Sequence, residues 1–147
     1  MNNVHRKEII SLARQIKKCW QTNDPYEIAD KLGIVIMECN SVLKDFTANI
    51  VKRPGFPTVI SINEKYDDFS KRLLCAHELG HALLHDNSFN SFGTTKNNAY
   101  TDVELEANLF ALALIGDNLI DSRLNTPLDK MGNYLLKSII DYNLNLR

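Results

Sequence analysis

The stretch 68–85 constrains the fold most, because it is nearly continuous in leucine and alanine yet carries histidines and a glutamate in its middle. Its spacing predicts one long, largely buried helix. Two imidazoles and a carboxylate are costly to bury in such a setting unless something pairs them. The fold must therefore place a metal ion or other polar groups against this helix. The apolar side chains around the polar ones are Leu73, Leu74, Ala76, Leu79, Ala82, Leu83 and Leu84.

The polar side chains in this helix form an HExxH sequence, His77-Glu78-Leu79-Gly80-His81. Residues four apart lie about one helical turn from each other, so His77 and His81 project from one face and can bind a single Zn²⁺. Glu78 lies about 100° round the helix from His77. From there its carboxylate can hold a water beside the metal and accept its proton. The alternative interpretation is a pair of hydrogen-bonded core histidines with a surface glutamate.

A catalytic zinc site needs a third protein ligand and one open position. A metzincin would have a third histidine at position 87, which is Asn87 here, so another helix has to supply the ligand. The segment 101–108 offers three carboxylates, and Glu104 is favoured because Asn108, four residues on, lies on the same face. Asn108 can then accept a hydrogen bond from a zinc-bound histidine.

Other interpretations of this segment stay open. Glu106 lies about 200° round the helix from Glu104, and Asp102 is the remaining carboxylate. Thr101 and Glu104 also form a capping-box pattern, in which Glu104 would cap the helix and bind no metal. A metal shared by two helices requires their close approach, which three small residues favour: Gly80, Ala107 and Ala111.

The remaining patterns predict an α+β fold that begins with helices. Residues 4–20 have apolar positions at helical spacing. A short helix follows, with Asp24 as N-cap, Pro25 in the first position, Glu27 completing a capping box and Gly33 at its end.

A small sheet and three further helices follow. Strand patterns at 34–39, 46–52 and 58–62 predict a three-stranded, mostly antiparallel sheet, with turn residues joining the last two strands. The HExxH helix comes next, then a polar, irregular segment at 86–100 and a helix at 102–115. Pro127 opens a C-terminal helix. The apolar face of that helix is Leu128, Met131, Leu135, Ile139 and Tyr142.

Composition limits the class of protein. The chain has 147 residues, 44% of them hydrophobic, and 17 Lys and Arg against 18 Asp and Glu give a net charge of −1. These values predict one globular domain over residues 1–147 and argue against direct nucleic-acid binding, which usually needs a distinctly basic surface. The basic residues of the first helix are interpreted as its solvated face. They are Arg6, Lys7, Arg14, Lys17 and Lys18.

The N-terminus and the cysteines favour a cytoplasmic location. Residues 1–10 are charged and lack the apolar core of a signal peptide, and no membrane partner is expected. Cys19, Cys39 and Cys75 form no CxxC pair and are predicted to be reduced thiols. Cys75 lies two residues before His77, but helical spacing turns it away from that histidine.

The segments 76–85 (AHELGHALLH) and 104–111 (ELEANLFA) together resemble the ImmA/IrrE metallopeptidases. These are small gluzincin-type zinc peptidases of bacteria, their phages and mobile elements. The resemblance implies that His77, His81 and Glu104 are zinc ligands and that Glu78 is the general base. It also implies cleavage of a helix-turn-helix transcriptional repressor, which derepresses mobile-element or stress genes.

The alternative function is a regulatory module that sequesters a transcription regulator without cutting it. Glu78 favours the enzyme, since a pure binder has no use for a base beside the metal. The oxyanion of peptide hydrolysis needs another donor, for which Tyr100, Tyr66 and His85 are candidates; His85 is about 80° off the ligand face. We expect the substrate to add as a strand to the sheet edge.

Overall fold

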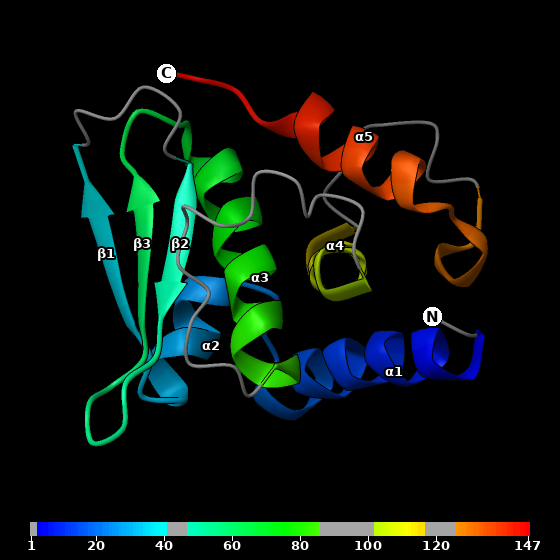
Figure 1. The fold of residues 1–147 in the computed structure, drawn as a ribbon, viewed down its shortest axis with the longest axis horizontal. Coiled ribbons are helices and arrows are strands. Elements are labelled where there is room, and N and C mark those ends of the chain that lie inside the picture. Colours follow the sequence, from blue (N-terminus) through cyan, green and yellow to red (C-terminus); the bar gives the residue numbers. More distant parts are fainter. Residues whose placement is uncertain (1–2, 41–46, 86–101, 117–125) are drawn as a thin grey trace.

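The computed structural model describes residues 3–40, 47–85, 102–116 and 126–147 (Figure 1). The chain folds in the order α1, α2, β1, β2, β3, α3, α4, a 3-10 helix η4, and α5. This order confirms the α+β class, while the single-domain boundary 1–147 stays a prediction. The bounds are α1 Asn3–Trp20, α2 Pro25–Lys31, β1 Val35–Cys39, β2 Ala48–Val51, β3 Val59–Asn63, α3 Asp68–Leu84, α4 Asp102–Ile115, η4 Leu128–Lys130 and α5 Asn133–Asn143.

The sheet is mixed, and this corrects the prediction of a mostly antiparallel sheet. Its strand order is β1-β3-β2, with β1 parallel and β2 antiparallel to β3. The turn between β2 and β3 contains Gly55 at a φ of 81°, a conformation that favours glycine, so these strands pair as a hairpin. β3 lies between β1 and β2, and strand spacing alone does not tell which partner β1 joins. Burial agrees with a central β3, where Ile60 and Ile62 are completely buried.

Helix α3 is the centre of the molecule, between the sheet and α4 (Figure 1). On the sheet side it packs Leu74 and Cys75 against buried isoleucines of β2 and β3. On the other side it joins the larger core formed with α1, α4 and α5. Helix α4 is buried over nearly its whole length after Glu106, as expected for a helix that is apolar on all sides.

Both ends of α3 are fixed by side chains. The carboxylate of Asp67 accepts a hydrogen bond from the backbone N–H of Ser70 at 2.8 Å, which caps the first turn. At the other end, Nζ of Lys52 donates to the carbonyl oxygens of Ala82 at 2.8 Å and His85 at 2.5 Å. These contacts set the helix within one residue of the predicted range and fix the position of the HExxH sequence.

The start of α2 differs in one contact from its predicted capping box. The Asp24 carboxylate accepts from the N–H of Tyr26 at 3.0 Å, as an N-cap should. The N–H of Asp24 donates to the hydroxyl of Thr22 at 3.1 Å. In the predicted capping box the side chain of Glu27 would accept this hydrogen bond. Gly33 ends the helix at a φ of 75°, as predicted.

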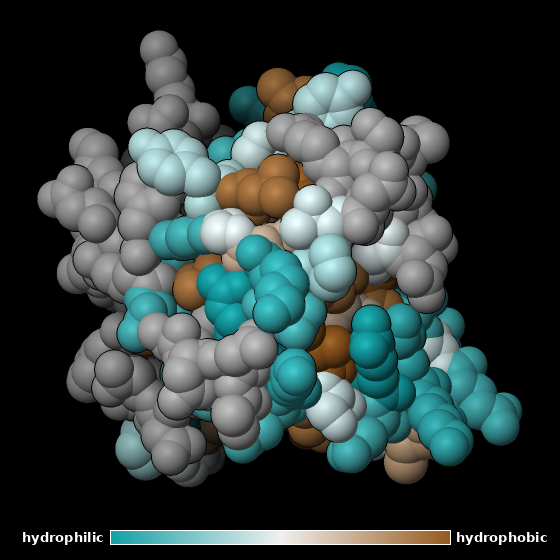
Figure 2. All heavy atoms as spheres, turned by 90° about the vertical axis from the view of Figure 1, so that its right-hand side faces the viewer, coloured by the Kyte–Doolittle hydropathy of each residue, from teal (hydrophilic) through white to brown (hydrophobic). Residues whose placement is uncertain are grey.

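The predicted C-terminal helix is wrong in its start and in part of its buried face. Pro127 precedes only the 3-10 turn η4, and α5 starts anew after its N-cap Gly132. This restart changes the inward face, so Leu136 and Ile140 are buried with Ile139, while Tyr142 is 69% exposed. Figure 2 shows the side of the molecule that carries α5, where hydrophobic surface occurs in small patches among hydrophilic residues. None of the described helices is long and apolar enough to cross a membrane.

Candidate metal centre

The close approach of α3 and α4 depends on Gly80. A Cβ atom at this position would lie 3.2 Å from both Cα of Ala107 and Cβ of Phe110, closer than side chains normally pack. The missing side chain therefore lets α4 lie directly against the HExxH face. This confirms the predicted use of Gly80 and Ala107 and brings Glu104, about one turn before Ala107, to the two histidines.

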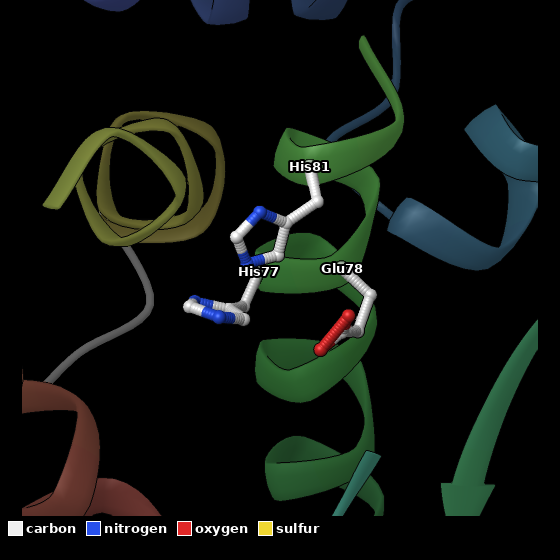
Figure 3. Close-up of side chains that lie close together, drawn as sticks. All are labelled: His77, Glu78 and His81. Atoms are coloured by element: carbon white, nitrogen blue, oxygen red, sulfur yellow. The ribbon is translucent and has the colours of Figure 1, made fainter. Parts of the chain in front are cut away.

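The predicted ligand residues lie together at this contact. Nε2 of His81 is 2.7 Å from Oε2 of Glu104, and Nε2 of His77 is 3.4 Å from Oε1 of the same carboxylate. The ligand atoms of His77, Glu78 and His81 all lie within 4.8 Å of one another. Figure 3 shows both imidazoles projecting from α3 towards α4, with Glu78 on the adjacent side of the helix.

Burial and the neighbouring charges set the protonation of these groups. Burial lowers the pKa of His81 in spite of the nearby Glu104, which favours the neutral imidazole that binds metals. Burial would raise the pKa of Glu104, but hydrogen bonds from His77 and His81 hold it far below its ordinary value. Burial and, to a lesser extent, the charge of Glu104 raise the pKa of Glu78 to about 7, although His77 opposes this shift.

The chemistry of the cluster fits a zinc ion. Two imidazole nitrogens and a carboxylate are common ligands of catalytic zinc. Nδ1 of His77 is buried without a hydrogen bond among the described residues. His77, His81 and Glu104 lie close enough together that they could hold such an ion.

A cavity of about 260 Å³ opens in front of the cluster. One wall is formed by β2, an edge strand of the described sheet, and the other by α5. Ser70 ties α5 to α3, because its hydroxyl donates to the carbonyl of Asn143 at 3.2 Å and accepts from the N–H of Asn145 at 2.7 Å. Besides His77, Glu78, His81 and Glu104, the cavity is lined by Thr47, Ala48, Asn49, Leu74, Asn108, Lys137, Ile140, Asp141 and Leu144.

Of the other predicted site residues that the structure describes, only Asn108 lines the cavity. It is among the groups that raise the pKa of His77, yet Nδ1 of His77 makes no hydrogen bond there. Its support of a zinc-bound histidine stays a prediction. His85 and Tyr66 do not line the cavity. Tyr100 lies outside the described residues, as do the partner Thr101 of the capping-box alternative and segment 86–100.

The two alternative carboxylates of α4 point elsewhere. Asp102 is exposed. Glu106 accepts hydrogen bonds at 2.8 Å through Oε1 from His85 and through Oε2 from His5.

Burial raises the pKa of the Cys75 thiol, which suits an inert core residue.

Three features of this region have no signal in the sequence. His5 lies 101 residues before Glu106, and no local pattern links positions so far apart. Oδ1 of Asn49 is buried without a partner among the described residues, beside the cavity. Lys137 and Asp141 of α5 line the cavity. The sequence did not predict this, because the direction of these side chains depends on where α5 begins after Gly132.

Comparison with known proteins gives two matches. Residues 29–118 match the family model described as the IrrE N-terminal-like domain, a peptidase family. The chain is 32% identical over 106 residues to "Uncharacterized immunity region protein 2" of Bacillus phage phi105. The aligned region covers 71% of this chain and 65% of that protein. The chain thus spans less than two thirds of the length of this relative. No solved structure matches.

Proposed function

Because the chain belongs to the IrrE N-terminal-like peptidase family, we propose that it is a zinc-dependent endopeptidase with a protein substrate. The observation that carries the proposal is the convergence of His77, His81 and Glu104 around one point, with Glu78 beside them. The family membership supports a metallopeptidase-like domain, and the geometry supports the proposal that the two histidines and Glu104 are the ligands and Glu78 the base.

Glu78 is the general base of this proposal. A bound zinc ion would polarise the peptide carbonyl and make water more acidic. A carboxylate with a pKa near 7 can accept a proton from the attacking water and return it to the leaving amine at neutral pH. Glu78 is only 8% exposed, so this proton transfer takes place away from bulk water.

The free edge of β2 is the proposed binding site for the peptide. β2 pairs only with β3 within the described sheet, and its residues 47–49 line the cavity. An extended peptide can pair with this edge through backbone hydrogen bonds that do not depend on its sequence. Oδ1 of Asn49, which has no hydrogen-bond partner among the described residues, can accept one backbone N–H of the substrate and fix its register.

The proposed substrate is a helix-turn-helix transcriptional repressor, which the chain would reach in the cytoplasm without contacting DNA itself. The support is the phage protein to which the chain is similar, which is named for an immunity region. A net charge of −1 fits a protein that acts on DNA only through a protein partner.

Co-expression with a helix-turn-helix regulator encoded next to this gene tests the proposal. We expect wild type to cleave the regulator and Glu78→Gln to leave it intact, with a rate loss of about a hundredfold or more for removal of a general base. Glu78→Gln should still bind zinc, because its histidines are unchanged. If wild type and Glu78→Gln both bind the regulator and neither cuts it, the chain is a sequestering module and the peptidase proposal is wrong.

A further inference from the structure

A chain of hydrogen bonds leads from the proposed zinc site to the surface through three helices. Nδ1 of His81 lies 3.0 Å from Nδ1 of His85. Nε2 of His85 lies 2.8 Å from Oε1 of Glu106, and Oε2 of Glu106 lies 2.8 Å from Nε2 of His5. Residues from α3 and its C-cap, from α4 and from α1 thus form one continuous series of contacts.

Only one placement of protons satisfies this series when His81 binds a metal. Its Nε2 faces Glu104 and must offer a lone pair to the ion, so the proton of the neutral ring is on Nδ1. That N–H donates to Nδ1 of His85, whose own proton is then on Nε2. A carboxylate oxygen only accepts, so Glu106 takes that N–H and thereby holds His85 in the required tautomer.

Burial isolates the inner part of this series from water. The exposed fraction of the side chain is 5% for His81, 11% for His85 and 15% for Glu106, against 45% for His5. Water therefore competes little for the inner bonds, whereas His5 is at the solvent end. Nζ of Lys52 also binds the carbonyl of His85 at 2.5 Å, which fixes the backbone from which this imidazole projects.

We propose that His85 and Glu106 are positioning residues, which fix the tautomer and the ring orientation of His81 so that its Nε2 faces the metal. Supporting groups of this kind commonly change metal affinity when they are removed. The inference rests on the proposed zinc site and adds a role for residues that do not touch the ion. It also gives a use to Glu106, the carboxylate of α4 that points away from the histidines of the HExxH sequence.

Zinc affinity, measured by competition with a chelator, tests this role without any need for a substrate. We expect Glu106→Ala and His85→Phe each to bind zinc about tenfold more weakly than wild type, or worse. Glu106→Gln should retain most of the affinity, because its side-chain oxygen can still accept from His85. His5→Ala is the matched control, since it removes only the outermost bond, and its affinity should stay within about twofold of wild type. Circular dichroism of each variant checks that the fold is kept.

Nitrogen NMR signals of the imidazole rings give a second readout that a general loss of stability would not produce. In the zinc-loaded protein His81 should be protonated at Nδ1 and His85 at Nε2, and Glu106→Ala should lose the fixed His85 tautomer. Unchanged zinc affinity in Glu106→Ala, equal weakening by Glu106→Ala and Glu106→Gln, or a His85 proton on Nδ1 would each overturn this inference alone. A wild type that binds no zinc would overturn the proposed function as well.

Discussion

Helix α3 contributes to two clusters of ionisable side chains, one near its start and one in its second half, and the groups of the two clusters are paired differently. Near the start, Nζ of Lys71 lies 2.9 Å from Oε1 of Glu38, and the hydroxyl of Tyr26 donates to Oε2 at 3.0 Å. In the second half of the helix, the Glu104 carboxylate faces the imidazoles of His77 and His81 with Glu78 beside them, and Nδ1 of His77 has no hydrogen bond among the described residues.

This difference separates a structural contact from a proposed ligand site. The Lys71 cluster satisfies its own charges, and hydrogen bonding from Lys71 lowers the pKa of Glu38. In the histidine cluster, burial raises the pKa of Glu78 although His77 opposes this shift, and the cluster faces a cavity. A bound cation would offset the negative charge of Glu78 and Glu104 in the second cluster. In the first cluster Lys71 already offsets the charge of Glu38.

The largest effect should come from adding zinc. At free zinc about a hundredfold above its Kd, binding to the folded state stabilises the protein by about 2.7 kcal/mol, so the melting temperature should rise by several degrees. His81→Ala should lose this rise. Lys71→Met, in the paired cluster, should have a lower starting melting temperature and keep the full rise.

Calorimetry with zinc and then with a chelator measures this contrast. Equal zinc responses of His81→Ala and wild type would remove the distinction between the two clusters.

A smaller effect is expected at the contact that positions Glu104. In Gly80→Ala the added methyl group meets backbone atoms of α4, and overpacking typically costs about 1–3 kcal/mol, of which better helix propensity returns about 1 kcal/mol. We expect a net loss of about 1 kcal/mol in the free energy of unfolding, and weaker zinc binding because α4 must move outward. Denaturant unfolding and zinc titration measure the two effects. Gly132→Ala is the control, since nothing lies within 4 Å of its added atom; if both substitutions alter zinc binding equally, close packing at Gly80 is not the cause.

The smallest effect is expected in the paired cluster. The pKa of Glu38 is lowered on folding, so its ion pair stabilises the protein above the ordinary carboxyl pKa and loses this contribution as pH falls through the folded pKa. Because Glu38 is partly exposed, Glu38→Gln should cost less than about 1 kcal/mol at pH 7. The gap between the two unfolding free energies should shrink in acid. A gap that widens in acid would contradict the assigned sign, and zinc affinity at pH 7 should not change.

Local patterns predicted the parts of this molecule that depend on near neighbours. The helix spacing of His77 and His81 is a property of a few residues, and it gave both the metal face and the position of Glu78. The close approach at Gly80 was also predictable, since small residues on two buried helices allow the helix backbones to pack closely together. The structure places Glu104 and not Glu106 beside His77 and His81, because residues two apart lie on different helix faces, and its role as a ligand stays a prediction.

Contacts between distant segments were not predictable from these patterns. The parallel pairing of β1 with β3 depends on how the chain crosses the sheet, and each strand has the same spacing in either arrangement. The bond between His5 and Glu106 joins α1 to α4, and the restart of α5 after Gly132 changed its buried face. In each case the local sequence pattern is compatible with more than one arrangement, and tertiary packing determines which one forms.

The central claim is that His77, His81 and Glu104 hold one zinc ion. Its most direct test is the zinc stoichiometry of wild type, Glu104→Ala and Glu106→Ala after equilibrium dialysis at the same free zinc concentration, well above the Kd of wild type. We predict one zinc per chain in wild type, none above background in Glu104→Ala, and one in Glu106→Ala, which binds more weakly but still saturates. One zinc in Glu104→Ala together with none in Glu106→Ala would contradict the assignment.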